Sequence, residues 1–125
     1  MTQAVRTRFS PSPTGNIHLG NIRTALFSAL YARKHRGVFI LRIEDTDKER
    51  SKESYTESLQ HDLHWLGIDW QEGPAVGGDY GPYWQSQRAN FYNEYYQQLE
   101  QADLIYPCFC TDQELNLSRK LQLSR

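Results

Sequence analysis

Near the N-terminus, hydrophobic residues first alternate with polar ones and then recur at helical spacing. Val5, Thr7 and Phe9 alternate with two arginines, which predicts a β-strand that ends at or just after Phe9. Apolar residues then follow at intervals of three and four within residues 22–30, and this spacing predicts a helix. Gly37 follows a basic run and is expected to cap the C-terminus of that helix.

Residues 38–43 are almost continuously apolar, which predicts a second strand covered on both faces. The order strand, helix, strand predicts a right-handed parallel crossover. The predicted fold class is therefore α/β, with helices flanking a parallel sheet.

The middle of the chain continues this alternation of helices and loops. Residues 51–66 carry a second helical stripe, and Gly67 is expected to end that helix. Residues 68–70 are expected to form a short strand, whereas residues 72–82, rich in glycine and proline, predict a loop. Ser86 is expected to cap a third helix.

The C-terminal part has one clear start signal and no stop signal. Residues 105–110 are expected to be extended, and Thr111 with Glu114 matches a capping box that opens a last helix. Residues 115–125 end within an amphipathic pattern, so we expect that the chain is cut short.

Length and composition narrow the class of protein. The 125 residues suffice for about one small domain, and no apolar stretch is long enough for a membrane span. The N-terminus lacks the apolar core of a signal peptide, so we expect a cytoplasmic protein. The net charge of −1 conceals a basic first part, residues 1–50, and an acidic middle, residues 51–115. A basic half is consistent with a polyanionic partner, while an acidic half can equally be a solvated surface.

A loop punctuated by proline and glycine joins the first predicted strand to the helix. The run Arg8-Phe-Ser-Pro-Ser-Pro-Thr-Gly15 leads into His18-Leu-Gly-Asn21, where the helix begins. Backbone N–H groups and the positive end of the helix dipole suit such a junction to phosphate binding. The prolines are expected to fix the entry of the loop, and Gly15 and Gly20 to allow a ligand to approach the backbone. The alternative is that His18 is only a helix cap or a surface residue.

Two charged residues flank this loop at the ends of the two strands. Arg8 lies near the end of the first strand, and Glu44 directly follows the second. Ligands of open parallel sheets bind beyond the carboxyl ends of the strands. A guanidinium and a carboxylate placed there suit a zwitterionic substrate. The alternative is that the two side chains pair with each other or face water.

The run from Arg8 to Leu26 resembles the opening of bacterial glutamyl-tRNA synthetases, which are class I enzymes with a Rossmann-like catalytic domain. Further blocks that resemble this family follow in order at residues 42–47, 72–74, 81–83 and 85–88. The resemblance covers nearly the whole chain, so it is far more specific than a single motif.

The resemblance implies an activity and a domain organisation. Residues 1–105 would form the N-terminal half of the catalytic domain, and residues 106–125 the start of an inserted zinc-knuckle region that binds the tRNA acceptor end. The implied reaction is the activation of L-glutamate with ATP and Mg²⁺ to glutamyl-adenylate, followed by transfer to tRNA(Glu), in a monomeric parent enzyme. Ser12 favours the glutamate type, because the related glutaminyl enzymes usually have a glutamate at that position.

The resemblance also assigns roles to the loop and helix start. His18 matches the first histidine of the HIGH signature, which stabilises the ATP phosphates, while Asn21 replaces the last histidine of that signature. The positions expected to contact ATP are Pro11, Ser12, Pro13, Thr14, Gly15, His18, Gly20 and Asn21. Losing one donor such as His18 is expected to cost about 10²–10³ in rate.

Further positions match the amino-acid and tRNA sites of the family. Arg8 would bind the side-chain carboxylate of glutamate and Glu44 its α-amino group. The complete set of expected glutamate-binding residues is Arg8, Ser10, Ser12 and Glu44, and Asp47 and Arg50 resemble positions near the tRNA 3′ end.

The two cysteines suit a metal-ligand pair better than a disulfide framework, because only one residue separates them. Cys108 and Cys110 resemble the first half of the zinc knuckle of many bacterial members. Structural Zn²⁺ requires four ligands, so the site is expected to be incomplete in this chain.

The family's lysine-rich KMSKS-type loop has no match in the sequence, so we expect the isolated chain to be inactive. One alternative is a non-catalytic paralogue that binds a nucleotide or glutamate. Another is the related glutamyl-Q tRNA(Asp) synthetase, which shares the first motif but lacks a block like residues 81–83. A third is a cytidylyltransferase-type enzyme, which would not need Arg8 and Glu44.

Overall fold

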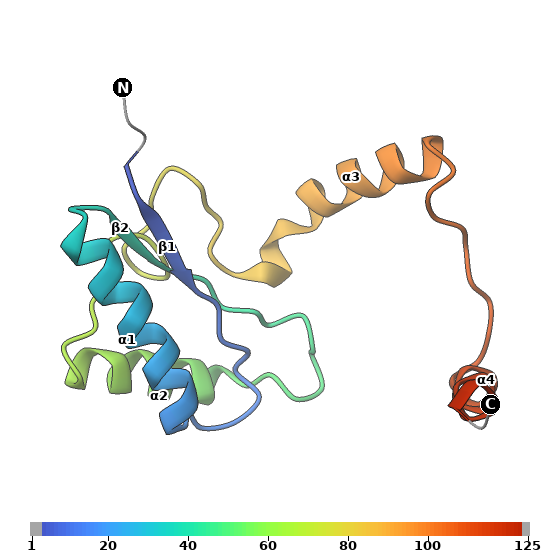
Figure 1. Cartoon of the computed structure of the whole chain (residues 1–125), viewed down its shortest axis with the longest axis horizontal. Helices are drawn as coiled ribbons and strands as arrows, with labels where there is room; N and C mark the ends of the chain where they lie inside the picture. The colour runs from blue at the N-terminus through green and yellow to red at the C-terminus, as the bar shows by residue number, and fades with distance from the viewer. Residues whose placement is uncertain (1–3, 124–125) are drawn as a thin grey trace. The chain divides into compact units, whose positions relative to one another are not determined.

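Two short parallel strands form the centre of the N-terminal part of the protein (Figure 1). Strand β1 spans Arg6–Phe9 and strand β2 spans Val38–Leu41, with Phe9 opposite Leu41 in the register. Helix α1, Leu19–Lys34, connects the two strands. The predicted strand, helix and parallel strand are therefore confirmed, and so is the α/β class.

The structure is a computed structural model that describes residues 4–123. Its contacts divide the chain into two compact units, Met1–Ala89 and Asn90–Arg125. Each unit is described by itself below. The domain boundary expected from the sequence, near residue 105, stays a prediction.

The core of the first unit lies on one face of the strand pair. Strand residues Phe9, Phe39 and Leu41 are buried there together with Ala25 of α1 and Leu63 of the second long helix. That helix, α2, spans Glu53–Trp65 and ends before Gly67, whose φ of 69° is left-handed as expected. Helix α1 packs on both strands, and the helical stripe predicted for α2 adds Leu59 and Leu63 to the same core.

The end of α1 differs from the expectation that Gly37 takes the capping conformation. Arg36 is the left-handed residue, with φ 50°, and its N–H donates to the Arg33 carbonyl. The N–H of Gly37 donates to the Ala32 carbonyl, which completes a Schellman-type cap. Gly37 is needed for another reason, because a Cβ there would lie 2.1 Å from the Val5 carbonyl oxygen. The glycine lets the chain cross close to β1.

Residues 68–70 are buried in part but do not form a strand, so that prediction was wrong. Ile68 and Trp70 pack into the core, and pairing begins only after them. The Gln71 N–H donates to the Phe39 carbonyl, and Glu72 forms an isolated parallel bridge with Ile40. The sequence pattern identified the buried residues, but the backbone pairing with β2 starts at Gln71 and not within residues 68–70.

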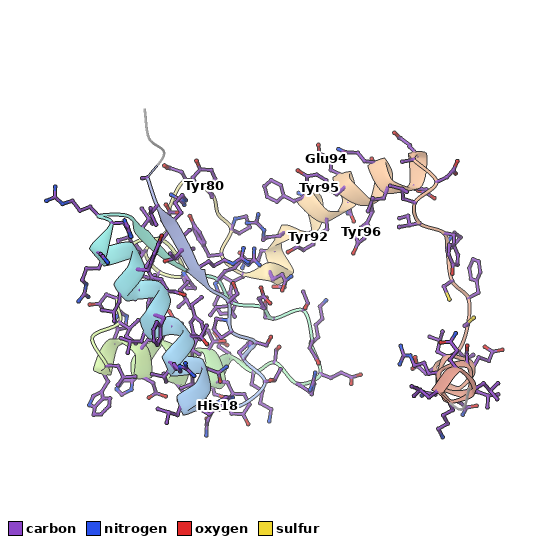
Figure 2. The ribbon with its side chains drawn as sticks, in the orientation of Figure 1. His18, Tyr80, Tyr92, Glu94, Tyr95 and Tyr96 are labelled. Carbon is purple, nitrogen blue, oxygen red and sulfur yellow. The ribbon has the colours of Figure 1, made fainter. Side chains whose placement is uncertain are left out.

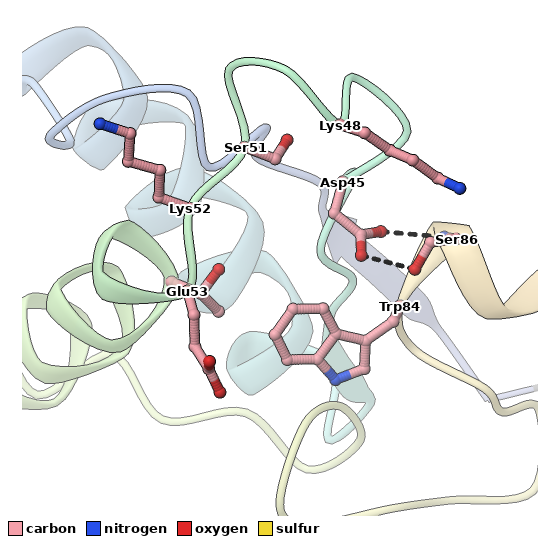
Figure 3. A pocket seen from close by; sticks show the side chains of 8 residues that line it. Asp45, Lys48, Ser51, Lys52, Glu53, Trp84 and Ser86 are labelled. Carbon is pink, nitrogen blue, oxygen red and sulfur yellow. Dashed lines mark hydrogen bonds between the residues drawn. The ribbon is translucent and has the colours of Figure 1, made fainter.

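Ser86 does not cap a helix, because it bonds a side chain distant in the sequence. Its N–H and its hydroxyl both donate to the Asp45 carboxylate, at 2.9 and 2.6 Å (Figure 3). The segment Gln85–Arg88 forms a 3₁₀ turn, here η1, and helix α3, Ala89–Gln101, follows it. Two tertiary hydrogen bonds therefore use the groups that a cap would have used.

The second unit carries helix α4, Asp112–Leu123. Its capping box is confirmed, because the Glu114 N–H donates to the Thr111 hydroxyl while the Glu114 carboxylate accepts from the Thr111 N–H at 2.7 Å. The tyrosines of α3, labelled in Figure 2, are at most half-buried, and no residue of α3 or α4 is fully buried. Among residues 4–123, no helix is both long and apolar enough to cross a membrane.

Candidate active site

The proline loop that follows β1 is held by its carbonyl groups. The Pro11 carbonyl accepts from the Glu44 N–H at 2.9 Å, and the Pro13 carbonyl accepts from the Lys52 N–H at 3.1 Å. A proline has no N–H to satisfy, so each residue contributes one acceptor and a fixed φ. Both prolines are buried. The loop is thus anchored to the segment after β2 and to the start of α2.

This loop and the start of α1 line one cavity of about 590 Å³. The cavity extends from the end of β1 to the first turn of α1. Its lining residues are Arg8, Phe9, Ser10, Pro11, Ser12, Thr14, Gly15, Asn16, His18, Asn21 and Thr24. Most of the expected ATP-binding positions therefore surround one cavity, together with the expected glutamate-binding residues Arg8, Ser10 and Ser12. Their roles as ligand contacts stay predictions.

His18 occupies the N-cap position of α1 (Figure 2). Its Nδ1 accepts a hydrogen bond from the Gly20 N–H at 3.2 Å, and its backbone N–H lies 3.5 Å from the Asn21 Oδ1. Because Nδ1 is an acceptor, a neutral ring carries its proton on Nε2, which remains a donor for a ligand. His18 is therefore both the cap of α1 and a residue of the cavity wall, and its binding of phosphate stays a prediction.

The glycines of the loop differ in what they allow. A Cβ at Gly20 would lie 3.0 Å from the His18 Cε1, so the imidazole occupies the space that a larger residue would need. A Cβ at Gly15 would have no neighbour within 4 Å. Gly20 therefore makes room for the His18 ring, and Gly15 lies beside open space at the cavity.

Four arginines lie around the face of the strand pair opposite the core. Arg6 forms an ion pair with Glu72 at 2.6 Å, and Arg42 forms one with Glu44 at 2.8 Å. Arg88 donates to two backbone carbonyls. Arg8 is exposed, and within residues 4–123 its guanidinium has no side-chain or backbone partner.

A second, smaller cavity of about 160 Å³ lies on this face. It is lined by Arg8, Ile40, Arg42, Tyr80, Tyr83 and Arg88. Because Arg8 lines both this cavity and the larger one, its side chain lies where they adjoin. Val38 and Ile40 of β2 are only partly buried on this face. The prediction that β2 is covered on both faces was therefore wrong.

Glu44 bonds Arg42 rather than Arg8. Its Oε1 accepts from Arg42 Nη2, so the alternative in which Arg8 and Glu44 pair with each other does not hold. Glu44 is outside the lining of both cavities, but its neighbour in the ion pair lines the smaller one. Arg42 thus bonds Glu44 and lines the same cavity as Arg8.

Glu72 is a buried carboxylate that ties the glycine-rich loop to β1. It accepts hydrogen bonds at 2.6 Å from both Arg6 and the Tyr83 hydroxyl. The bond to Arg6, and then the bond to Tyr83, hold the pKa of Glu72 below its usual range. Burial, and then the bond to Glu72, raise the pKa of Tyr83. Arg6 also lies 4.5 Å from the ring centre of Tyr80.

The two residues expected near the tRNA 3′ end bond each other. Arg50 Nε donates to Asp47 Oδ2 at 2.6 Å, and this bond lowers the pKa of the Asp47 carboxyl. The pair lies in the turn between β2 and α2 and lines none of the cavities above. Its role in tRNA binding stays a prediction.

The cysteines lie in the second unit. Cys108 and Cys110 are exposed free thiols, and the hydrogen bond that the Cys110 thiol donates to Cys108 raises the pKa of Cys110. Within the described part of the chain, no group of three or more metal-ligand side chains comes together. His64, a histidine of α2, instead bonds Asp69 at 2.6 Å. These residues alone do not complete a four-ligand zinc site.

Sequence reasoning missed the roles of Arg42, Glu72 and Tyr83. Each lies inside a block that resembles the family, but none carries a local signal for a contact across the sheet. The alternation of side chains along a strand could have placed Arg42 on the same face as Arg8.

A parallel strand pair, a helix capped by histidine and an anchored loop beside one cavity form an α/β unit whose cavity lies at a helix N-terminus, an arrangement suited to phosphate binding. The chain belongs to the family of class I tRNA synthetases (E and Q), whose catalytic-domain model matches residues 4–125. The resemblance of the sequence to that family is therefore confirmed.

Named relatives point to the glutamate branch of the family. The chain is 60% identical over 121 residues to glutamate–tRNA ligase 2 of Nitrosococcus oceani, a match that covers 97% of this chain and 26% of that protein. It is 53% identical over 117 residues to glutamate–tRNA ligase 2 of Caldicellulosiruptor saccharolyticus, covering 94% of this chain and 24% of that protein. The crystal structure of glutamate-tRNA synthetase from Elizabethkingia anophelis matches with a TM-score of 0.90 and 44% identity over 98% of this chain and 25% of that one. The chain thus spans about a quarter of the length of these relatives.

Proposed function

We propose that the full-length protein that contains this chain activates L-glutamate with ATP and Mg²⁺ and transfers the glutamyl group to tRNA(Glu). This chain would supply the HIGH-type part of the ATP site and part of the glutamate pocket. The relatives named above are glutamate–tRNA ligases, and the structural relative from Elizabethkingia meningosepticum is described as in complex with its amino acid.

The observation that carries the proposal is the environment of Arg8. Among four neighbouring arginines, it alone lacks a partner in the described residues, and it lines the same cavity as His18. The hydroxyl of Ser10, in that cavity wall, is buried and has no hydrogen-bond partner among residues 4–123. An unpartnered guanidinium and an unpartnered hydroxyl suit a ligand carboxylate, since its oxygens would accept a hydrogen bond from each of them.

The chemistry requires positioning rather than a nucleophile of the protein. An oxygen of the glutamate α-carboxylate attacks the α-phosphorus of ATP, the bond to the β-phosphate oxygen breaks, and pyrophosphate leaves. His18 Nε2–H and the start of α1 are suited to stabilise charge on the phosphate oxygens. Arg8 would hold the side-chain carboxylate away from the reacting one, so that only the α-carboxylate is activated.

The finer parts of the proposal concern tRNA and metals. We infer that Asp47 and Arg50 lie near the tRNA 3′ end, and that any Zn²⁺ would need ligands in addition to Cys108 and Cys110. A cytoplasmic, monomeric enzyme is what the resemblance implies.

The test replaces Arg8 by glutamine in the full-length protein and measures ATP–pyrophosphate exchange with glutamate in the presence of tRNA(Glu). The KM for glutamate should rise by about 30-fold or more while the KM for ATP changes little, because an anchor for one carboxylate is lost. The matched control is Arg33→Gln, which removes an exposed arginine in the last turn of α1.

Three outcomes would contradict the proposal. The first is an equal rise of the KM for glutamate and of the KM for ATP in Arg8→Gln. The second is a rise of the KM for glutamate in Arg33→Gln as large as that in Arg8→Gln. The third is the absence of glutamate-dependent exchange in the unmodified protein.

A further inference from the structure

Arg42 makes the most direct contact to a residue of the expected glutamate pocket. Its Nη2 donates to Glu44 Oε1 at 2.8 Å, and both side chains are mostly buried, with 19% and 30% exposed. The Glu44 backbone is fixed as well, since its N–H donates to the Pro11 carbonyl. Only the side-chain torsions of Glu44 remain free, and the bond to Arg42 restricts them.

Arg42 also faces the cavity that Arg8 lines. Its Nε is buried and has no partner in the described residues, although a buried guanidinium donor normally has one. The same side chain therefore contacts Glu44 through one nitrogen and carries an unused donor at another.

We propose that Arg42 is a positioning residue for amino-acid recognition, which holds the Glu44 carboxylate so that its second oxygen accepts from the α-ammonium group of glutamate. The proposal rests on the proposed function and assigns to Arg42 a role that acts only through Glu44. A carboxylate has lone pairs on both oxygens, so Oε2 stays available while Oε1 is held.

The guanidinium is suited to this role because its planar fork fixes the direction of the carboxylate, which the single point charge of a lysine does not do. The Arg6–Glu72 pair on the same face provides a comparison, because it joins two structural residues and not a residue of the expected pocket.

The test compares two ligands in the full-length protein. One is L-glutamate, measured by its KM in pyrophosphate exchange, and the other is glutarate, which lacks the α-ammonium group, measured as a competitive inhibitor. Arg42→Gln should raise the KM for glutamate by about 10- to 100-fold and leave the inhibition constant of glutarate within about twofold. Arg42→Lys, which keeps the charge, should show a smaller effect of the same kind and serves if the glutamine variant does not fold.

The control variant is Arg6→Gln, which breaks the other ion pair. It should lower the melting temperature but leave the ratio of glutamate to glutarate affinity unchanged. Equal weakening of both ligands by Arg42→Gln, or the same change of ratio in Arg6→Gln, would show that Arg42 is merely structural. In that case Arg8→Gln, which should weaken both ligands, would still support the proposed function. An unmodified protein without glutamate-dependent exchange would instead overturn both proposals.

Discussion

The two faces of the β1–β2 pair have opposite chemistry although they arise from the same eight residues. On one face Phe9, Phe39 and Leu41 pack against the helices and are at most 5% exposed. On the other face Arg8 and Ile40 border a cavity. The strand period of two residues separates these sets, so a residue and its neighbour in sequence belong to different environments.

The apolar face therefore stabilises the unit, whereas the face that borders the cavity is available for binding. Buried apolar area and close packing lower the free energy of the folded state. Unpaired donors beside a cavity contribute little to folding, because water satisfies them when no ligand is bound. Substitutions on the two faces should therefore separate stability from activity.

The largest effect on stability is expected from Leu41→Ala, which removes a fully buried side chain. The free energy of unfolding should fall by about 2–5 kcal/mol. Ile40→Ala is the matched control, one position along the same strand and facing the cavity, and it should cost less than half as much. Urea unfolding followed by circular dichroism measures both, and equal losses would contradict the distinction between the faces.

A large effect on rate, with a small effect on stability, is expected from His18→Gln in the full-length protein. Loss of the Nε2–H donor should lower kcat for pyrophosphate exchange by about 10²–10³. The lost cap should cost about 1 kcal/mol of stability. His61→Gln changes an exposed histidine of α2 and should alter neither quantity. A normal kcat for His18→Gln would remove His18 from the proposed reaction.

A change of pH is expected to have an intermediate effect on stability, because the pKa values of Glu72 and Tyr83 are shifted in the folded state. The pKa of Glu72 is lowered from 4.5 in the folded state, so its contribution to stability is present above that pH and is lost as the pH falls through the folded pKa. The pKa of Tyr83 is raised from 10.0, so its contribution is present below that pH and is lost as the pH rises through the folded pKa. Melting temperatures over a pH series measure both limbs. Glu72→Gln should flatten the acidic limb and Tyr83→Phe the alkaline one, and an unchanged profile in either variant would contradict the assignment.

The smallest effect on the free energy of unfolding is expected from Arg8→Gln. The guanidinium is exposed and has no partner in the described residues, so the free energy of unfolding should stay within about 0.5 kcal/mol of the unmodified chain. The same substitution should have a large effect on glutamate binding. A loss of several kcal/mol on unfolding would mean that Arg8 supports the fold rather than a ligand.

Local patterns predicted the elements whose signals lie within a few residues. The alternation at Val5–Phe9, the stop at Gly67 and the capping box at Thr111 all need only neighbouring residues, and each is confirmed. The predictions that Ser86 and Gly37 cap helices were wrong, because each residue contacts a segment distant in the sequence. Ser86 bonds Asp45, and Gly37 is required by the approach of the Val5 backbone rather than by its own φ.

The sequence alone identified the family, because the proline loop, His18 and the family blocks are contiguous motifs. The tertiary structure decided how the other charges are paired: Arg6 bonds Glu72, which lies 66 residues further along the chain, and Arg8 is left without a partner in the described residues. Such pairs depend on which side chains face the same side of the sheet. Those relations arise only when segments distant in the sequence pack together, which is why no local pattern contains them.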